Sequence, residues 1–197
     1  MPDIYLVGVG GQGIITASRI IGEVALIAGK NVLLSETHGM AQRGGSVVCT
    51  ARIGEMSSPL IPDGSADLLL SFELLETLRG LCKASKRTLI VASNERVVPL
   101  SVSKQKLTYP TVEYVLSESK KVAKDCAIID ARKIAEEAGA PMSSNVVMIG
   151  ALAGSRITGL DEKDFEKGIE SVIQRRLEEN LAAFRGGAKA VAEVFGS

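Results

Sequence analysis

The amino-acid sequence predicts an α/β fold: a doubly wound, mostly parallel sheet with helices on both faces and a helical C-terminal third. Short apolar runs alternate with longer stretches of helical spacing through most of the 197 residues, a pattern typical of strand–helix units around a parallel sheet. Glycine-rich segments follow the first two apolar runs, where buried strands should end. No linker, internal repeat or low-complexity tract interrupts the chain, so residues 1–197 are expected to form one domain.

The predicted strands are short apolar runs bounded by turn residues. They comprise residues 3–9, 31–35, 46–53, 66–72, 88–92 and 127–129. No helix-length segment separates the second run from the third, whereas parallel strands need a crossover of about a dozen residues or more. The third strand is therefore expected to be antiparallel, either added at an edge of the sheet or folded as a ribbon. Residues 93–110 carry only weak β-like signals.

The predicted helices show apolar residues at helical spacing. They comprise residues 14–28, 73–82, 112–124, 131–138, 145–156 and 177–195, together with one that starts after residue 161. Gly29 is well placed to end the first helix, and Asn145 and Asp161 can cap later ones. Gly186-Gly187 should weaken or bend the last helix. The helix from Asn145 is apolar almost all round, which indicates burial in the core or in a subunit contact.

Composition excludes several classes of protein. Lys+Arg and Asp+Glu residues both number 23, and this zero net charge argues against a nucleic-acid-binding protein, which normally has a basic excess. No apolar run approaches the roughly 20 residues that span a bilayer. The N-terminal residues lack the charged start and cleavage site of a signal peptide. We therefore expect a cytoplasmic protein that binds neither nucleic acid nor a membrane.

The three cysteines, Cys49, Cys82 and Cys126, are scattered along the chain without a C-x-x-C pair. Their spacing cannot assemble a zinc site or an iron–sulfur cluster locally. In a reducing compartment we expect all three to be small, buried hydrophobic residues. We predict no metal site in this chain.

The first glycine-rich segment, Gly8-x-Gly10-x-x-Gly13, matches a dinucleotide-binding fingerprint with a strand before it and a helix after it. Glycines permit a tight turn and let a phosphate approach backbone N–H groups at a helix N-terminus. Glu36 lies roughly 20 residues further on, where an acid that binds the ribose would be sought. The alternative is that the glycines only permit tight strand-to-helix packing, a role expected of Gly13, or shape a surface for a partner.

The second segment, Glu36–Ser46, contains the only histidine, His38, together with Gln42 and Arg43. A histidine in a polar, glycine-flanked loop is more typical of a functional or interface residue than of a core residue. Arg43 could hold a carboxylate or phosphate through its planar guanidinium, or could brace the loop itself. Because the carboxyl ends of strands lie side by side in an open α/β sheet, the two segments should face each other.

His38 and Arg43 are the candidate catalytic residues of these segments. The other members of the two segments are candidates for contacting a cofactor or a partner subunit. They are Gly8, Gly10, Gly11, Gln12, Gly13, Glu36, Gly39, Met40, Gln42, Gly44, Gly45 and Ser46.

Several segments together resemble the gamma module of the 2-oxoacid:ferredoxin oxidoreductases. They are Gly8–Gly13, Glu36–Ser46 and Asp63–Glu73, followed in order by Thr108–Thr111, Ile129–Ala131 and Asn145–Ala151. The resemblance covers nearly the whole chain. The His-Gly-Met-x-Gln-Arg-Gly-Gly element in the second segment is far more specific than the glycine turn alone.

The resemblance implies oxidative decarboxylation of a 2-oxoacid, in particular indolepyruvate or another aryl pyruvate, to an acyl-CoA with electrons passed to ferredoxin. It also implies that thiamine diphosphate, Mg²⁺ and iron–sulfur clusters belong to a large partner subunit, with CoA as co-substrate and ferredoxin reached through the complex. The sequence agrees, since it has neither a cysteine cluster nor the Gly-Asp-Gly and Asn-Asn pattern of a metal–diphosphate site. This chain is therefore expected to hold no cofactor and to be inactive alone.

Three alternatives stay open at this point. The chain could be the gamma subunit of an enzyme for pyruvate, 2-oxoglutarate or 2-oxoisovalerate. It could be a free-standing NAD-binding Rossmann-type protein, although only His38 is available as an acid or base facing the nicotinamide. It could also be a pure interaction module whose glycine loops contact other subunits and bind no small molecule.

Overall fold

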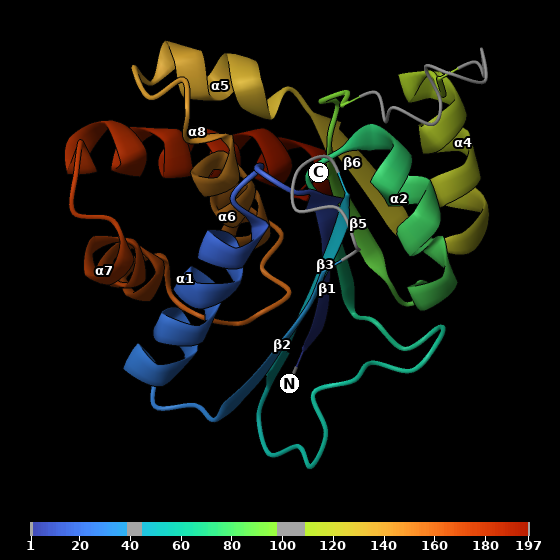
Figure 1. Cartoon of the computed structure of the whole chain (residues 1–197), viewed down its shortest axis with the longest axis horizontal. Coiled ribbons are helices and arrows are strands. Elements are labelled where there is room, and N and C mark those ends of the chain that lie inside the picture. Colours follow the sequence, from blue (N-terminus) through green and yellow to red (C-terminus); the bar gives the residue numbers. More distant parts are fainter. Residues whose placement is uncertain (1, 39–44, 98–108, 197) are drawn as a thin grey trace.

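The computed structural model describes residues 2–38, 45–97 and 109–196, which form a six-stranded sheet flanked by helices (Figure 1). The spatial order of the strands is β2-β3-β1-β4-β5-β6. Their bounds are β1 Asp3–Val9, β2 Val32–His38, β3 Ser46–Ile53, β4 Leu68–Ser71, β5 Leu89–Ser93 and β6 Asp125–Ile129. The six predicted strands are confirmed. Most of the weakly patterned stretch 93–110 lies outside the described residues.

Strand β3 is the one that departs from the parallel arrangement. It runs antiparallel to both of its neighbours, whereas β1, β4, β5 and β6 pair in parallel. The predicted direction is confirmed, and so is the ribbon with β2, because the short connection between them permits a hairpin. The other arrangement that the sequence allowed, addition of β3 at an edge, is not found: β3 lies between β1 and β2, which leaves β2 at the edge.

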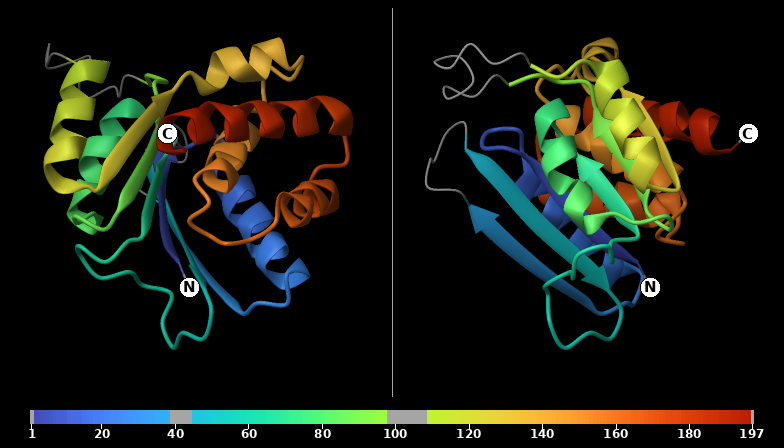
Figure 2. Two further views of the ribbon diagram at one scale, coloured as in Figure 1. Left: turned by 180° about the vertical axis from the view of Figure 1, so that it is seen from behind. Right: turned by 90° about the vertical axis from the view of Figure 1, so that its right-hand side faces the viewer.

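Helices cover both faces of the sheet, as Figures 1 and 2 show. On one side lie α2 (Leu74–Gly80), the 3-10 turn Leu81–Lys83 and α4 (Val112–Val122). On the other lie α1 (Ile14–Ile27), α5 (Ala131–Glu137), α6 (Ser144–Gly154), α7 (Glu162–Val172) and α8 (Leu177–Phe195). The last four make the C-terminal third helical, as predicted. Among the helices that the structure describes, none is long and apolar enough to cross a membrane.

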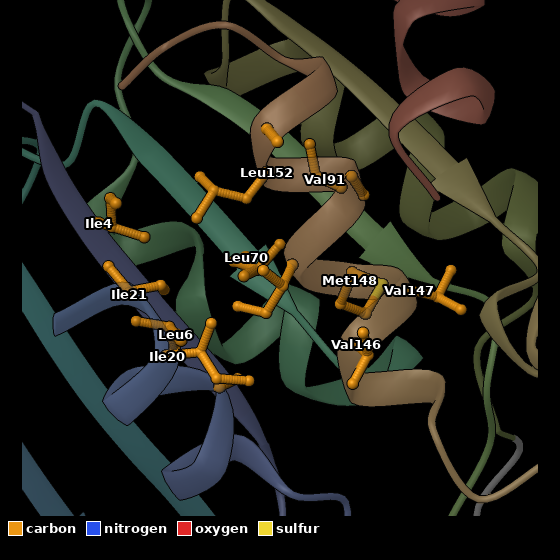
Figure 3. Close-up of a cluster of buried hydrophobic side chains, with 14 of the residues drawn as sticks. Ile4, Leu6, Ile20, Ile21, Leu70, Val91, Val146, Val147, Met148 and Leu152 are labelled. Carbon is orange, nitrogen blue, oxygen red and sulfur yellow. The ribbon is translucent and has the colours of Figure 1, made fainter. Parts of the chain in front are cut away.

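The larger hydrophobic core lies between α6 and the centre of the sheet (Figure 3). Residues 146–154 of α6 are all buried. They join one cluster with side chains of β1, β4, β5 and α1, of which Figure 3 labels Ile4, Leu6, Ile20, Ile21, Leu70 and Val91. The apolar pattern of this helix allowed burial either in the core or in a subunit contact. The structure shows that α6 is buried in the core of the chain itself.

Helices α6 and α8 approach each other closely because glycines lie at their crossing. A Cβ atom added to Gly150 would lie 1.9 Å from the carbonyl oxygen of Phe184, and one added to Gly187 would lie 2.0 Å from that of Val147. Helix α8 runs unbroken through Gly186 and Gly187. The two glycines that were expected to weaken or bend the helix therefore do not interrupt it, and tight packing against α6 offsets the low helix propensity of glycine.

The predicted helix ends are confirmed in one case and differ in two. Gly29 has a φ angle of 68°, directly after the end of α1, and so stops that helix as predicted. The N-cap of α6 is Ser143 rather than Asn145. Asn145 lies in the first turn, and its side chain donates a 3.4 Å hydrogen bond to the carbonyl oxygen of Gly13. Asp161 occupies the N-cap of α7, but its side chain makes no capping bond.

The cysteines occupy three separate environments. Cys49 and Cys126 are buried as expected, whereas Cys82 is exposed, so the expectation is wrong for that residue. Cys82 lies in the 3-10 turn that follows α2 and belongs to neither core. Burial raises the pKa of the Cys49 thiol to about 12 and that of Cys126 to about 11.

We predict that Gly187→Ala lowers the free energy of unfolding by about 3 kcal/mol, because the added methyl group must push the two helix backbones apart. Gly186→Ala is the matched control, since its Cβ would meet one side-chain methyl group, Cγ2 of Ile134 at 2.7 Å, and no backbone atom. This control should stay within about 1 kcal/mol of wild type, because the gain in helix propensity offsets that contact. Thermal unfolding of both variants measures the difference, and equal melting temperatures would contradict the close crossing.

We also predict that one thiol per native chain reacts with a thiol reagent at pH 8 and that three react after unfolding. The reactive form is the thiolate, and the raised pKa values keep Cys49 and Cys126 protonated and buried at this pH. The Cys82→Ser variant should show no fast-reacting thiol. Rapid labelling of two thiols in the native chain would contradict the two buried environments.

Candidate functional site

The first glycine-rich segment forms a tight turn at the carboxyl edge of the sheet, between β1 and α1. Gly11 and Gly13 have φ angles of 105° and 74°, in the left-handed region that side chains disfavour, and Gly13 is the N-cap of α1. Gly8 is packed so tightly that an added Cβ would lie 2.7 Å from the side chain of Ile14 and 2.9 Å from that of Phe72. Gly8, rather than Gly13, therefore permits close packing of strand and helix.

The side chain of Gln12 spans the crevice between β1 and β4. Its oxygen accepts a 2.8 Å hydrogen bond from the backbone N–H of Val9, and its nitrogen donates a 2.9 Å bond to the carbonyl oxygen of Phe72. Helix α1 follows β1 on one face of the sheet and α2 follows β4 on the other (Figure 1). This place is therefore the topological switch point, where open α/β sheets bind their ligands. The Gln12 amide holds the ends of β1 and β4 together at this switch point.

The second segment meets the first, as the sequence predicts. The backbone N–H of Gly10 donates a 2.9 Å hydrogen bond to the carbonyl oxygen of Gly45. Ser46 follows directly, pairs with Val9 at the end of β1, and donates a 2.6 Å bond to a carboxylate oxygen of Glu76. The described end of the second segment is thus joined both to the glycine turn and to α2.

Two buried carboxylates lie behind this junction, in the first turn of α2. Glu73 and Glu76 are only 1% and 2% exposed. Glu73 caps α2 by accepting a 2.9 Å bond from the N–H of Glu76, and its other oxygen accepts a 3.1 Å bond from the N–H of Val97. Burial raises the pKa of Glu73, and these backbone N–H groups oppose that rise. Glu76 also pairs with Arg79.

A cleft of about 390 Å³ opens beside the glycine turn. It is lined by Gly11, Gln12, Gly13, Glu95, Arg132, Glu136, Pro141, Met142, Ser144 and Asn145. Helices α1 and α6 both begin here without a side-chain cap or an acidic residue in the first turn, so their N-termini carry partial positive charge. Arg132 is paired with Glu136 at 3.0 Å. The cleft could contact a small polar or anionic group through backbone N–H groups.

The other predicted site residues fall into two groups. Two of them lie in β2, and the rest lie outside the described residues. Glu36 is exposed within β2 and pairs with Cys49 across the ladder. The backbone of His38 pairs with Val47 at the end of β2. The remaining candidates lie outside the described residues, namely Gly39, Met40, Gln42, Arg43 and Gly44.

The position of β3 weighs against the dinucleotide-binding alternative. Glu36 is two strand spacings from β1, roughly 10 Å, whereas a ribose-binding acid is sought on the adjacent strand. The N–H of Gly10 is also engaged by Gly45 rather than turned toward a phosphate. The glycines here serve a turn that packs against its own chain.

The described residues do not fit a metal or iron–sulfur site. Among them, no three His, Cys, Asp or Glu side chains are grouped to hold a metal ion. Cys49 and Cys126 belong to different cores, and Cys82 is exposed.

Sequence reasoning missed Glu73, Glu76 and the contact of Asn145 with the glycine turn. Glu73 and Glu76 follow a buried strand with the three-residue spacing of one helical turn, which was a usable signal. The role of Asn145 had no such signal, because Gly13 lies 132 positions away along the chain.

The chain belongs to the pyruvate ferredoxin/flavodoxin oxidoreductase family, which it matches over residues 3–190. It is 41% identical to an indolepyruvate oxidoreductase subunit IorB of Methanothermobacter thermautotrophicus over 192 residues, 97% of this chain and 98% of that protein. It is 39% identical to the subunit of the same name from Archaeoglobus fulgidus over 186 residues, 94% of this chain and 92% of that protein.

The fold agrees with a solved structure of a related subunit. The pyruvate oxidoreductase subunit PORC of Thermotoga maritima aligns with a TM-score of 0.71 over 95% of both chains. Its sequence identity is 24%. The predicted α/β fold with a helical C-terminal third is therefore confirmed as the fold of these oxidoreductase subunits.

We predict that Gly13→Ala destabilises the chain more than Gly29→Ala. Both glycines have positive φ angles, but a Cβ at Gly13 would lie 2.6 Å from the side-chain nitrogen of Asn145, while nothing lies within 4 Å at Gly29. Backbone strain alone costs about 1 kcal/mol, so Gly29→Ala should show only that loss. Combining Gly13→Ala with Asn145→Ala should recover about 1 kcal/mol relative to additivity. Additive losses in urea denaturation would exclude the contact.

Proposed function

We propose that this chain is the small accessory subunit of an indolepyruvate:ferredoxin oxidoreductase. The observation that carries the proposal is the identity of 39–41% to indolepyruvate oxidoreductase subunits over at least 92% of each chain. In the assembled enzyme, an aryl 2-oxoacid such as indolepyruvate is oxidatively decarboxylated to an acyl-CoA, and the electrons pass to ferredoxin.

The cofactors of this reaction belong, in our proposal, to a large partner subunit. Thiamine diphosphate with Mg²⁺ supplies the decarboxylation chemistry there, and iron–sulfur clusters carry the electrons. The separated cysteines of this chain support that division, because neither buried thiol has a second thiol in the same core. The chain alone is then inactive.

The carboxyl edge of the sheet is the part of this subunit that we expect to face the partner. It holds the glycine turn, the start of β3 and the end of β2, and these elements are joined by hydrogen bonds within the chain. His38 and Arg43, both from the second glycine-rich segment, are the candidate catalytic or interface residues. Arg43 is the first to test, because a guanidinium suits the carboxylate of a 2-oxoacid, a phosphate of CoA or a carboxylate of the partner.

Reconstitution tests the proposed function. The chain is co-expressed with a large thiamine diphosphate and iron–sulfur subunit of an indolepyruvate oxidoreductase, and 2-oxoacid-dependent reduction of methyl viologen is measured anaerobically with CoA. We expect activity from the complex and none from the chain alone. We expect kcat/KM for indolepyruvate to exceed that for pyruvate and 2-oxoglutarate by at least about tenfold, equivalent to 1.4 kcal/mol. A higher value for pyruvate or 2-oxoglutarate would refute the assigned substrate.

A pair of arginine variants tests the role of the edge. Arg43→Ala should lower turnover or weaken assembly of the complex while changing the stability of the free chain by no more than about 0.5 kcal/mol. Arg87→Ala is the control, since Arg87 is an exposed arginine just before β5, at the amino edge. If both variants assemble and turn over like wild type, the assignment of Arg43 is wrong. Early melting of the free Arg43→Ala chain would mark that residue as a structural brace.

A further inference from the structure

The first turn of α2 is a point where distant segments of the chain converge. Its three leading backbone N–H groups each have a partner. That of Leu74 donates to the carbonyl oxygen of Glu95, that of Leu75 to the hydroxyl of Tyr109, and that of Glu76 to the carboxylate of Glu73. The turn is therefore held to the segments that follow β5 and precede α4.

The side chain of Glu76 extends this network to the glycine turn. One of its oxygens accepts the hydrogen bond from Ser46 and the other accepts one from Arg79. Ser46 is the first residue of β3, and the preceding carbonyl, that of Gly45, accepts the bond from Gly10. A continuous path of hydrogen bonds and one peptide unit thus runs from α2 through β3 to the glycine turn.

The burial of Glu76 indicates what this contact achieves. A carboxylate that is 2% exposed loses its hydration, a cost that is recovered only through strong hydrogen bonds. An apolar side chain would fill the same space without that cost, but could not accept a bond from Ser46. The charge-assisted bond to a hydroxyl is short, at 2.6 Å, and directional. It fixes where β3 begins relative to α2.

We propose that Glu76 is a positioning residue of the carboxyl edge, acting through Ser46 to hold the start of β3 against the glycine turn. Glu73 supports it by capping the helical turn on which Glu76 lies. Glu76 itself is buried, so its proposed effect on the edge passes through Ser46. The consequence for turnover rests on the proposed function, whereas the consequence for the geometry of the edge does not.

Amide hydrogen exchange of the full chain tests the geometry directly. The N–H of Gly10 is protected by its bond to Gly45, so its exchange rate reports whether the two segments stay together. We expect Ser46→Ala and Glu76→Gln each to accelerate this exchange about tenfold or more, and the double variant to do no more than either alone. Ser117→Ala is the control, because it removes an exposed serine bond to Tyr114 in α4, away from the edge. It should leave the exchange of Gly10 unchanged.

Kinetics of the reconstituted complex test the consequence for function. Ser46→Ala and Glu76→Gln should lower kcat by at least threefold with less than a twofold change in KM, and again the two losses should not add. A merely structural role would lower the amount of assembled complex without this selective and non-additive loss in kcat.

The outcomes separate the two proposals. Unchanged exchange of Gly10 in both variants, or additive effects in the double variant, would overturn the positioning role of Glu76. The Arg79→Ala variant gives a second test. If it lowers kcat as much as Glu76→Gln does while the exchange of Gly10 is unchanged, the loss of kcat comes from the ion pair between Glu76 and Arg79, and the positioning role is again overturned. Accelerated exchange in a chain whose wild-type complex has no oxidoreductase activity would support the positioning role and refute the proposed function.

Discussion

The antiparallel insertion of β3 between β1 and β2 is the constraint on which the candidate site depends. Because β3 runs against its neighbours, it begins at the edge where β1 and β2 end. Its first residue, Ser46, therefore lies beside Val9 and next to the glycine turn. A parallel β3 would start at the opposite edge of the sheet, and the second glycine-rich segment would no longer meet the first.

The helical layer holds the same edge from behind. Close approach of α6 and α8 through Gly150 and Gly187 places α6 deep in the core. The N-terminal turn of α6 then reaches the glycine turn through Asn145 and Gly13. The carboxyl edge is therefore held by three sets of contacts. They come from the ladder between β1 and β3, from the first turn of α2 and from the first turn of α6.

Local features of the fold could be predicted from the sequence, and long-range features could not. Apolar runs and helical spacing located the six strands and the C-terminal helices, because period and composition act over a few residues. The place of β3 in the sheet depends on pairing with β1, more than forty positions away in places, as for Asp3 and Arg52. The exposure of Cys82 depends on the 3-10 turn that ends α2, which its sequence pattern did not reveal.

Only the outline of the candidate site could be predicted from the sequence. Glycines at the ends of two strands predicted a candidate edge, and the meeting of the two segments at Gly10 and Gly45 follows from sheet topology. The buried state of Glu73 and Glu76 is set by tertiary contacts with Val97 and Ser46, and an acidic residue in a short helix is ordinarily solvated.

Gln12 gives the edge a property that the other contacts do not. Its amide closes the crevice between Val9 and Phe72 in the free chain, the place where related α/β folds receive a ligand. Because both halves of the amide are already bonded, this part of the turn has little conformational freedom left to lose when another surface covers it. Association then costs less entropy at this position. A crevice that serves as a ligand receptacle in other open α/β folds is here closed by an amide of the chain itself.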